Sequence, residues 1–376
     1  MSAADPADGG QSAALEWAAK FCTSGPVESA RRFGSGHVND TFLVTDAAGA
    51  EYVLQRVGPP AFKRPEQVMA NILRVTGAMA GVADRRRRLT LVPMRDGGWW
   101  ATAEGDCWRM YDFIADSCEL SPPLTPTEFA AVGRAFGDFL VQVAAVPPDD
   151  LFVTIPGYHD WPAYVERLKS AVAKDPCGRV SGVRADIERV LAYEQAAHSL
   201  DDAGLPLRVT HNDAKVANAL FDESTHEPLC VIDLDTVQPG WSVNDFGDMV
   251  RSGAATAPED DPDVSRVRLS MELYEACLRG YLSACGDILQ PSEIAHMRDG
   301  ARMMTLETSL RFLTDYVEGD VYYRIAYPGQ NLDRARNQAT LLADIDRHWD
   351  EMDAAVQSVV GSGPRRATPV DARTIN

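Results

Sequence analysis

The spacing of hydrophobic and polar residues changes once along the chain. From about residue 29 to residue 114 the apolar residues form short runs of the kind found in β-strands. These runs lie at residues 42–44, 52–54, 89–92, 99–101 and 108–114. One helical segment interrupts them at about residues 65–79, where Val68, Ile72 and Val75 recur at helical spacing. The pattern therefore predicts a five-stranded sheet with one helix at the start of the chain.

Helical spacing prevails from residue 125 onward. Thr125 followed by Pro126 is typical of a helix start, and this helix is expected to run to about residue 145. Another helix is expected at residues 161–173, and a third is marked by an apolar stripe at Met303, Leu306, Leu310, Leu313 and Val317. Shorter apolar runs at residues 207–210, 219–221 and 229–232 predict strands, the last two as a hairpin. The whole pattern predicts an α+β, bilobal fold with a β-rich N-terminal lobe and a mainly helical C-terminal lobe.

The most informative polar residues are His211-x-Asp213-x-Lys215-x-x-Asn218 and, further on, Asp233. Phosphoryl transfer requires mainly positioning of the reactants and neutralisation of charge on the phosphoryl oxygens. Asp213 is expected to accept the proton of an acceptor hydroxyl, and Lys215 to contact the γ-phosphate. Taken alone, His211, Asn212 and Asp213 are also typical of an ordinary turn. The compatible spacing of all the polar residues favours a kinase.

Two residues of the same motif are suited to a metal ion. Asn218 offers a neutral oxygen and Asp233 an anionic one, and Mg2+ prefers oxygen ligands. His211 is interpreted as a support for the loop, since this chemistry needs no imidazole base. The sequence thus predicts ATP and Mg2+ as cofactors.

Polar residues of the β-rich lobe are candidates for nucleotide contacts. Gly34 and Gly36 let the backbone approach phosphates closely, although an ordinary hairpin turn has the same composition. His37 is placed to contact the acceptor. Gln55 and Arg56 stand where a kinase usually has a phosphate-binding lysine, and strand alternation allows only one of them to face the nucleotide. Met110 is also expected at the nucleotide.

The lobes are expected to meet near residues 112–116. Residues 13–114 would then form the nucleotide-binding lobe, and residues 115–360 the catalytic and acceptor-binding lobe. Residues 1–12 and 361–376 are small, polar and proline-containing, and are expected to be disordered.

Other polar residues of the C-terminal lobe allow two interpretations. Asp245 is expected to hydrogen-bond the backbone of the catalytic loop from behind rather than to bind metal. Arg311 and Asp315 have the spacing of a surface ion pair on a helix. The alternative is a sugar-binding wall made by Arg311 with Tyr322 or Tyr323, and spacing alone does not decide between them.

Charge and composition narrow the choice of partners. The formal net charge of −19 argues against nucleic acid and anionic membranes as partners. The basic run at residues 85–88 is interpreted as a solvated turn. The seven cysteines lack metal or disulfide spacing and are expected to be reduced thiols. No secretory signal or membrane-length apolar run is present, so a cytoplasmic location is expected, and nothing indicates an oligomeric state.

Six strings of the sequence carry a family resemblance. They are Gly36-His-Val-Asn-Asp-Thr-Phe42, Val53-Leu-Gln-Arg56, His211-Asn-Asp-Ala-Lys215, Val231-Ile-Asp-Leu-Asp-Thr-Val237, Asp245-Phe-Gly-Asp-Met-Val-Arg251 and Leu310-Arg-Phe-Leu-Thr-Asp-Tyr316. The chain resembles the N-acetylhexosamine 1-kinases of the aminoglycoside phosphotransferase and choline kinase superfamily, over about residues 33–342. The resemblance implies a protein-kinase-like fold and phosphorylation of the anomeric hydroxyl of GlcNAc or GalNAc with ATP.

The resemblance also implies roles for individual residues. Asp213 would be the catalytic base, Asn218 and Asp233 the Mg2+ ligands, and Gln55 would stand in the lysine position. The sugar contacts would be His37, Asp213, Arg311 and Tyr322. Two alternatives stay open: a kinase of the same superfamily for another sugar, an aminoglycoside or an amino alcohol, and a nucleotide-binding regulator without catalysis.

Overall fold

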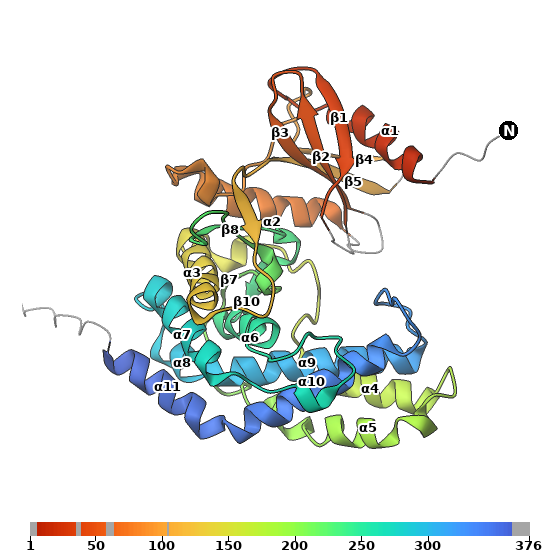
Figure 1. The fold of residues 1–376 in the computed structure, drawn as a ribbon, viewed down its shortest axis with the longest axis vertical. Helices are drawn as coiled ribbons and strands as arrows, with labels where there is room; N and C mark the ends of the chain where they lie inside the picture. Colours follow the sequence, from red (N-terminus) through yellow and green to blue (C-terminus); the bar gives the residue numbers. More distant parts are fainter. Residues whose placement is uncertain (1–5, 35–38, 58–63, 104, 363–376) are drawn as a thin grey trace, which may run out of the picture.

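The chain folds into two lobes, drawn one above the other in Figure 1. The computed structural model describes residues 6–34, 39–57, 64–103 and 105–362. The upper lobe contains an antiparallel sheet, and the lower lobe is mainly helical. The predicted α+β, bilobal architecture is therefore confirmed.

The sheet of the upper lobe has the strand order β1-β2-β3-β5-β4. Its strands are β1 (Val27–Arg32), β2 (Asn39–Asp46), β3 (Glu51–Val57), β4 (Trp100–Ala103) and β5 (Asp106–Asp112). Helix α1 (Pro6–Ala18) covers one face, where the rings of Trp17 and Trp108 stack at 5.4 Å. Helix α2 (Pro65–Ala78), which was predicted, packs on the opposite face, beside the lower lobe. The two faces of the sheet thus belong to separate apolar cores.

Two predictions for the upper lobe are wrong. Residues 89–92 form no strand, and Leu91 makes only an isolated bridge to β5, because β4 occupies that edge of β5 from Asp106 to Arg109. The fifth strand is instead β1, an edge strand whose mostly polar residues form no apolar run. Residues 6–12 were expected to be disordered but belong to helix α1.

The lower lobe is built on helices of very different lengths. Their bounds are α3 (Pro126–Val143), α4 (Trp161–Lys174), α5 (Arg184–Leu191), α6 (Ser242–Gly253), α7 (Met271–Cys285), α8 (Pro291–Ala295), α9 (Met297–Glu318), α10 (Gln330–Arg347) and α11 (Trp349–Ser362). Helices α3, α4 and α9 confirm the three that were predicted. Thr125 and Glu128 form a capping box at the start of α3. Gly280 of α7 abuts the carbonyl of Ala130, so α3 and α7 approach too closely for a Cβ there. Beyond residue 362, the expected C-terminal tail lies outside the described residues.

Two small sheets flank residues 211–218. Strand β7 (Arg208–Thr210) pairs with β10 (Gln238–Gly240). The other sheet joins β6 (Ser117–Glu119), β8 (Ala219–Asp222) and β9 (Pro228–Val231), and it contains the predicted hairpin. The N–H of Ile232 donates to the carbonyl of Asn218 at 2.9 Å, so the segments bearing Asn218 and Asp233 are held side by side.

A buried asparagine of α2 ties the two lobes together. Asn71 is 1% exposed and lies in the upper lobe by sequence. Its amide donates to the carbonyls of Phe152 and Val237 at 2.8 and 2.9 Å, and accepts from the N–H of Phe152 at 2.9 Å. All three bonds go to backbone of the lower lobe. Helix α2 is therefore fixed to both lobes.

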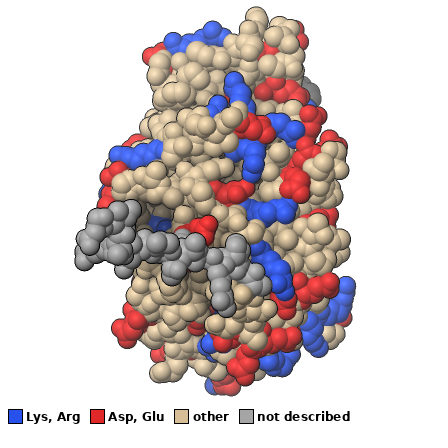
Figure 2. All heavy atoms as spheres, turned by 90° about the vertical axis from the view of Figure 1, so that its left-hand side faces the viewer, with Lys and Arg blue, Asp and Glu red and all other residues tan. Residues whose placement is uncertain are grey.

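The basic run forms a short 3-10 helix (Arg85–Arg87) whose charges are paired. The ion pairs are Arg85 with Asp112 at 2.6 Å, Arg86 with Asp222 at 2.6 Å, and Arg87 with Asp138 at 2.7 Å. Exposed pairs of this kind stabilise little individually. On the face drawn in Figure 2, basic and acidic side chains are interspersed. None of the described helices is both long and apolar enough to cross a bilayer, and all seven cysteines are free thiols.

Candidate active site

The loop that begins at His211 is held from behind by buried groups. The Asp245 carboxylate accepts hydrogen bonds from the backbone N–H groups of His211 and Asn212 at 2.8 and 2.7 Å. The predicted role of Asp245 is therefore confirmed. The His211 ring hydrogen-bonds the carbonyl of Ile232 at 2.9 Å and lies edge-on to two phenylalanines. His211 is thus a structural support, as predicted.

Asp213 is oriented by two neighbours on the same loop. Lys215 Nζ lies 2.7 Å from Asp213 Oδ2, and Asn218 Nδ2 donates to that oxygen at 2.8 Å. Burial acts to raise the pKa of Asp213, but the Lys215 ammonium and the Asn218 amide outweigh burial and hold this pKa below its ordinary value. Asp213 is therefore an oriented, ionised carboxylate. The structure brings together these three predicted site residues.

Asp233 lies at the start of the next turn, where its backbone has a left-handed φ of 61°. Burial, followed by the nearby carboxylates of Asp235 and Asp213, raises the pKa of Asp233 to about 6. Because Asn218 donates through Nδ2, its amide oxygen is the end that can meet a cation. The buried carboxylate of Asp233, on a segment held next to that of Asn218, fits a hard divalent cation, which would neutralise its charge.

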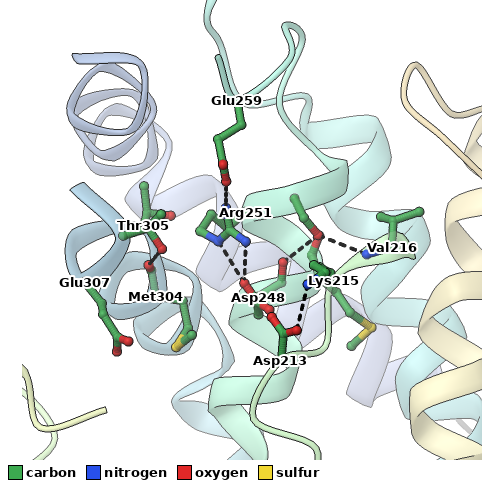
Figure 3. Close-up of polar contacts among 12 residues, drawn as sticks. Asp213, Lys215, Val216, Asp248, Arg251, Glu259, Met304, Thr305 and Glu307 are labelled. Atoms are coloured by element: carbon green, nitrogen blue, oxygen red, sulfur yellow. Dashed lines mark hydrogen bonds and ion pairs between the residues drawn. The ribbon is translucent and has the colours of Figure 1, made fainter. Parts of the chain in front are cut away.

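A further acidic group on α6 lies next to the catalytic loop. Asp248 pairs with Arg251 at 2.8 Å, and Arg251 also pairs with Glu259. Figure 3 shows the Asp248 carboxylate between the Arg251 guanidinium and Asp213. Burial and the charge of Asp213 raise the pKa of Asp248, while Arg251 opposes the change. Asp248 is therefore a member of the site, positioned by the Arg251 and Glu259 pair.

The structure distinguishes the two candidates on β3. Arg56 points to the α1 side of the sheet, where it pairs with Asp40 at 2.8 Å and Asp106 at 3.6 Å. Gln55 points to the opposite side and contacts Arg109 of β5. Strand alternation therefore turns Gln55, rather than Arg56, toward the lower lobe, and the predicted nucleotide contact of either residue stays a prediction.

The structure describes some, but not all, of the remaining residues that were expected to contact the nucleotide or the acceptor. Met110 is fully buried in the core under α1, on the face of the sheet opposite to Gln55. Gly34 has a φ of 76° and begins the connection between β1 and β2. Gly36 and His37 lie outside the described residues. Their predicted contacts stay predictions.

Arg311 on α9 is surrounded by aromatic rings. Its guanidinium carbon lies between 5.6 and 5.9 Å from the ring centroids of Tyr158, Tyr164, Tyr322 and Tyr323. Its ion-pair partner is Glu307 at 3.3 Å, one turn back. Asp315 instead accepts hydrogen bonds from the backbone N–H groups of residues 321–323, so of the two interpretations the ion pair of Arg311 with Asp315 is wrong. Tyr322 is 66% exposed and lies at the outer edge of this cluster.

A buried histidine connects the Arg311 cluster with the catalytic loop. His159 Nδ1 lies 2.8 Å from a Glu307 carboxylate oxygen, and His159 Nε2 lies 3.2 Å from the carbonyl oxygen of Asn212. Both partners are acceptors, so the imidazolium form can donate to both. Burial acts to lower the pKa of His159, but Glu307 raises it above its ordinary value. A continuous polar chain thus runs from Arg311 to the residue preceding Asp213.

Sequence comparison agrees with this arrangement of groups. Residues 29–287 match the phosphotransferase enzyme family. The chain belongs to this family. The matched segment includes Asp213, Asn218 and Asp233.

Solved structures of other phosphotransferases share the fold. A microcompartment-associated aminopropanol kinase is 17% identical, with a TM-score of 0.57 over 91% of this chain and 98% of that one. An amicoumacin kinase in complex with AMP-PNP and Ca2+ is 14% identical, with a TM-score of 0.61 over 88% and 92%. A spectinomycin phosphotransferase in complex with ADP and spectinomycin is 11% identical, with a TM-score of 0.57 over 93% and 97%. At these identities the likeness concerns the fold.

Several polar residues of this phosphotransferase were missed in the sequence. Asp248 and Arg251 stand in the string that begins at Asp245, and that string was the available signal. Asp235 likewise follows Asp233 within a quoted string. His159 and Glu307 carry no local motif, because they meet only through the packing of α9 against the segment before α4.

Replacing Glu307 by Gln is expected to destabilise this phosphotransferase by about 3 kcal/mol at pH 6, since it breaks a buried ion pair. The pKa of His159 is raised, so the pair stabilises fully below the ordinary value of 6.5 and less as pH rises through the folded value. The gap in Tm between wild type and Glu307→Gln should therefore narrow from pH 6 to pH 9. Thermal unfolding at each pH measures this gap in Tm. Glu166→Gln is the control, because it makes the same chemical change at an exposed position. A gap independent of pH would contradict the assignment.

Proposed function

We propose that the protein is an ATP- and Mg2+-dependent kinase that phosphorylates the anomeric hydroxyl of an N-acetylhexosamine, GlcNAc or GalNAc. The product would be the sugar 1-phosphate, formed by direct in-line transfer. The observation that carries the proposal is Asp213, held between Lys215 and Asn218 next to Asp233 in a phosphotransferase fold. Related structures hold AMP-PNP with Ca2+ or ADP, which supports a nucleotide donor.

Asp213 is the group suited to activate the acceptor. Its free carboxylate edge would accept a hydrogen bond from the hydroxyl and then its proton, as the oxygen attacks the γ-phosphorus and the bond to ADP breaks. Lys215 lies 2.7 Å from Asp213 and can move to the γ-phosphate when the nucleotide binds. This pairing keeps both groups charged before the reaction.

Asn218 and Asp233 are the residues that would hold the metal. Bound Mg2+ would supply neutralisation of charge on the β- and γ-phosphate oxygens. Asp233 is suited to that role because burial and two neighbouring carboxylates disfavour its charge in the absence of a cation. Asn218 would add a neutral oxygen, and Mg2+ usually retains several waters.

The acceptor assignment rests on the resemblance in sequence and on the Arg311 cluster. A guanidinium can donate to an N-acetyl carbonyl or a sugar hydroxyl, and tyrosine rings can pack against a pyranose. A cationic acceptor would be repelled by Arg311, because the single charge of Glu307 is shared between Arg311 and the His159 ring. A neutral N-acetylated sugar therefore fits better than an aminoglycoside or an amino alcohol.

A panel of acceptors tests the acceptor assignment. ADP release would be measured with GlcNAc, GalNAc, glucose, galactose, choline, aminopropanol and an aminoglycoside, and the phosphate position would be assigned by NMR. We expect turnover with the N-acetylhexosamines and phosphate on the anomeric oxygen. Turnover only with amines would reject the sugar assignment, and ATP binding without phosphorylation of any acceptor would favour a regulator.

Replacing Arg311 by Leu is expected to raise KM for the acceptor by about 10-fold to 100-fold, since a hydrogen bond from a charged group is lost. KM for ATP should change little, because the residues proposed to meet MgATP in the C-terminal lobe are Lys215, Asn218 and Asp233 and not Arg311. Steady-state kinetics with each substrate varied in turn measure the difference. Arg279→Leu is a matched control, because Arg279 also pairs with a glutamate one helical turn away but at an exposed position. An equal rise in both KM values would contradict an acceptor role.

A further inference from the structure

Gln55 stands where a phosphate-binding lysine is expected, and the structure surrounds it with an unusual set of contacts. Gln55 lies directly opposite Arg109 in the pairing of β3 with β5. Its amide oxygen accepts from Arg109 Nε at 3.0 Å and from Arg109 Nη2 at 2.8 Å. Arg109 itself is 1% exposed. The fully buried Arg109 guanidinium thus holds the half-buried Gln55 amide through two hydrogen bonds.

These contacts fix the orientation of the Gln55 amide. Both Arg109 groups are donors, so the Gln55 atom that faces them must be the oxygen. The amide nitrogen, Nε2, is thereby turned away from Arg109 and lies 3.4 Å from the hydroxyl oxygen of Thr41. A cation bound to the oxygen of an amide also strengthens its N–H groups as donors. Gln55 therefore presents polarised donors on the side of the sheet that faces the lower lobe.

The charge of Arg109 is balanced by a residue of the lower lobe. Arg109 Nη1 donates to Asp235, which is 4% exposed. Asp235 also accepts from the side chain of Asn39 on β2 at 2.8 Å. It lies two residues after Asp233, the carboxylate proposed to bind metal. The same ion pair thus joins the support of Gln55 to the segment that carries Asp233.

We propose that Gln55 donates a hydrogen bond to the nucleotide phosphates in place of lysine, and that Arg109, balanced by Asp235, positions Gln55 for this contact. A lysine at position 55 would carry its positive charge on β3, whereas in this chain the charge lies on the neighbouring strand β5, at Arg109. Its carboxylate partner comes from the turn after Asp233. Helix α2 offers Arg109 only the sulfur of Met69, at 3.9 Å. Arg109 acts through Gln55 and is a positioning residue.

This arrangement predicts that lysine does not suit position 55 in this chain. An ammonium there would lie beside the Arg109 guanidinium in a buried setting, where like charges repel strongly. Glutamate at position 55 would gain an ion pair with Arg109 but would present a carboxylate to the phosphates. Both substitutions should therefore weaken nucleotide binding, although only lysine should also lower stability.

The test is binding of MgADP in the absence of any acceptor, measured by calorimetry. We expect Gln55→Glu to weaken binding by about 10-fold or more without a lower Tm, and Gln55→Lys to bind more weakly than wild type and to have a lower Tm. The matched control is Gln195→Glu, the same change at an exposed position of the lower lobe. Affinity equal to or above that of wild type in either Gln55 variant would overturn the proposal.

A double-mutant cycle tests the role of Arg109. Arg109→Lys keeps a charge for Asp235 but lacks the two donors that converge on Gln55. Arg109→Lys and Gln55→Leu should each weaken MgADP binding, and the double variant should lose no more than either single one. Additive losses would overturn positioning through Gln55. The inference rests on the proposed nucleotide dependence, so failure of wild type to bind MgADP would instead contradict the proposed function.

Discussion

Replacing Asp213 by Asn is expected to lower kcat by about 10²–10⁴-fold, the usual contribution of a general base. The amide has the shape of the carboxylate and can still accept from Lys215 and Asn218, so the loop should keep its conformation. It cannot take up the proton of the acceptor hydroxyl. The loss should therefore appear in turnover and not in nucleotide affinity.

Two measurements separate these effects in Asp213→Asn. ADP release in the presence of acceptor reports turnover, and calorimetry with MgADP reports nucleotide binding. Asp201→Asn is a suitable control, because it makes the same chemical change at an exposed position. If Asp213→Asn retained more than about a tenth of wild-type kcat, another group would have to act as the base.

Asp233→Asn is expected to lower kcat/KM for MgATP by about 100-fold or more, since an anionic metal ligand contributes several kcal/mol of charge stabilisation. Asparagine tolerates the left-handed backbone at this position better than alanine does. It also removes one of the crowded carboxylates, whose pKa is raised to about 6. The metal-free variant should therefore be at least as stable as wild type at pH 7.

A titration with MgCl2 at fixed ATP measures the effect in Asp233→Asn. The variant should need a higher Mg2+ concentration for half-maximal rate, while its Tm without metal stays equal or rises. Asp116→Asn is the matched control, because Asp116 also has a positive φ of 52° but lies exposed between the lobes. A lower Tm without metal would indicate that Asp233 stabilises the fold rather than binding a cation.

Features encoded by neighbouring residues were predictable from the sequence. The start of α3 follows from Thr125, Pro126 and Glu128, which lie within one turn. The contacts among Asp213, Lys215 and Asn218 also arise within one loop. The role of Asp245 was deduced because Asp233 already occupied the position of a metal ligand. In each case the decisive residues are close in sequence.

Features that depend on tertiary packing were not predictable. His159 and Glu307 are 148 residues apart, and Arg109 and Asp235 are 126 residues apart. In both pairs, the sequence around each residue is no different from that around an ordinary charged residue. Strand β5, which carries Met110, is buried on both faces, so its sequence does not indicate which side meets a ligand. Residue identity alone could not tell that Arg109, rather than Arg56, lies beneath Gln55.

The hydrogen bonds of Asn71 cross the boundary near residue 114, where the two lobes are expected to meet. A helix encoded before this boundary completes the backbone hydrogen bonding of Phe152 and Val237, which are encoded after it. Cutting the chain there would leave a buried amide on one fragment and orphaned peptide groups on the other. Each half of this phosphotransferase therefore supplies hydrogen-bond partners that the other half needs, so neither half satisfies its buried polar groups by itself.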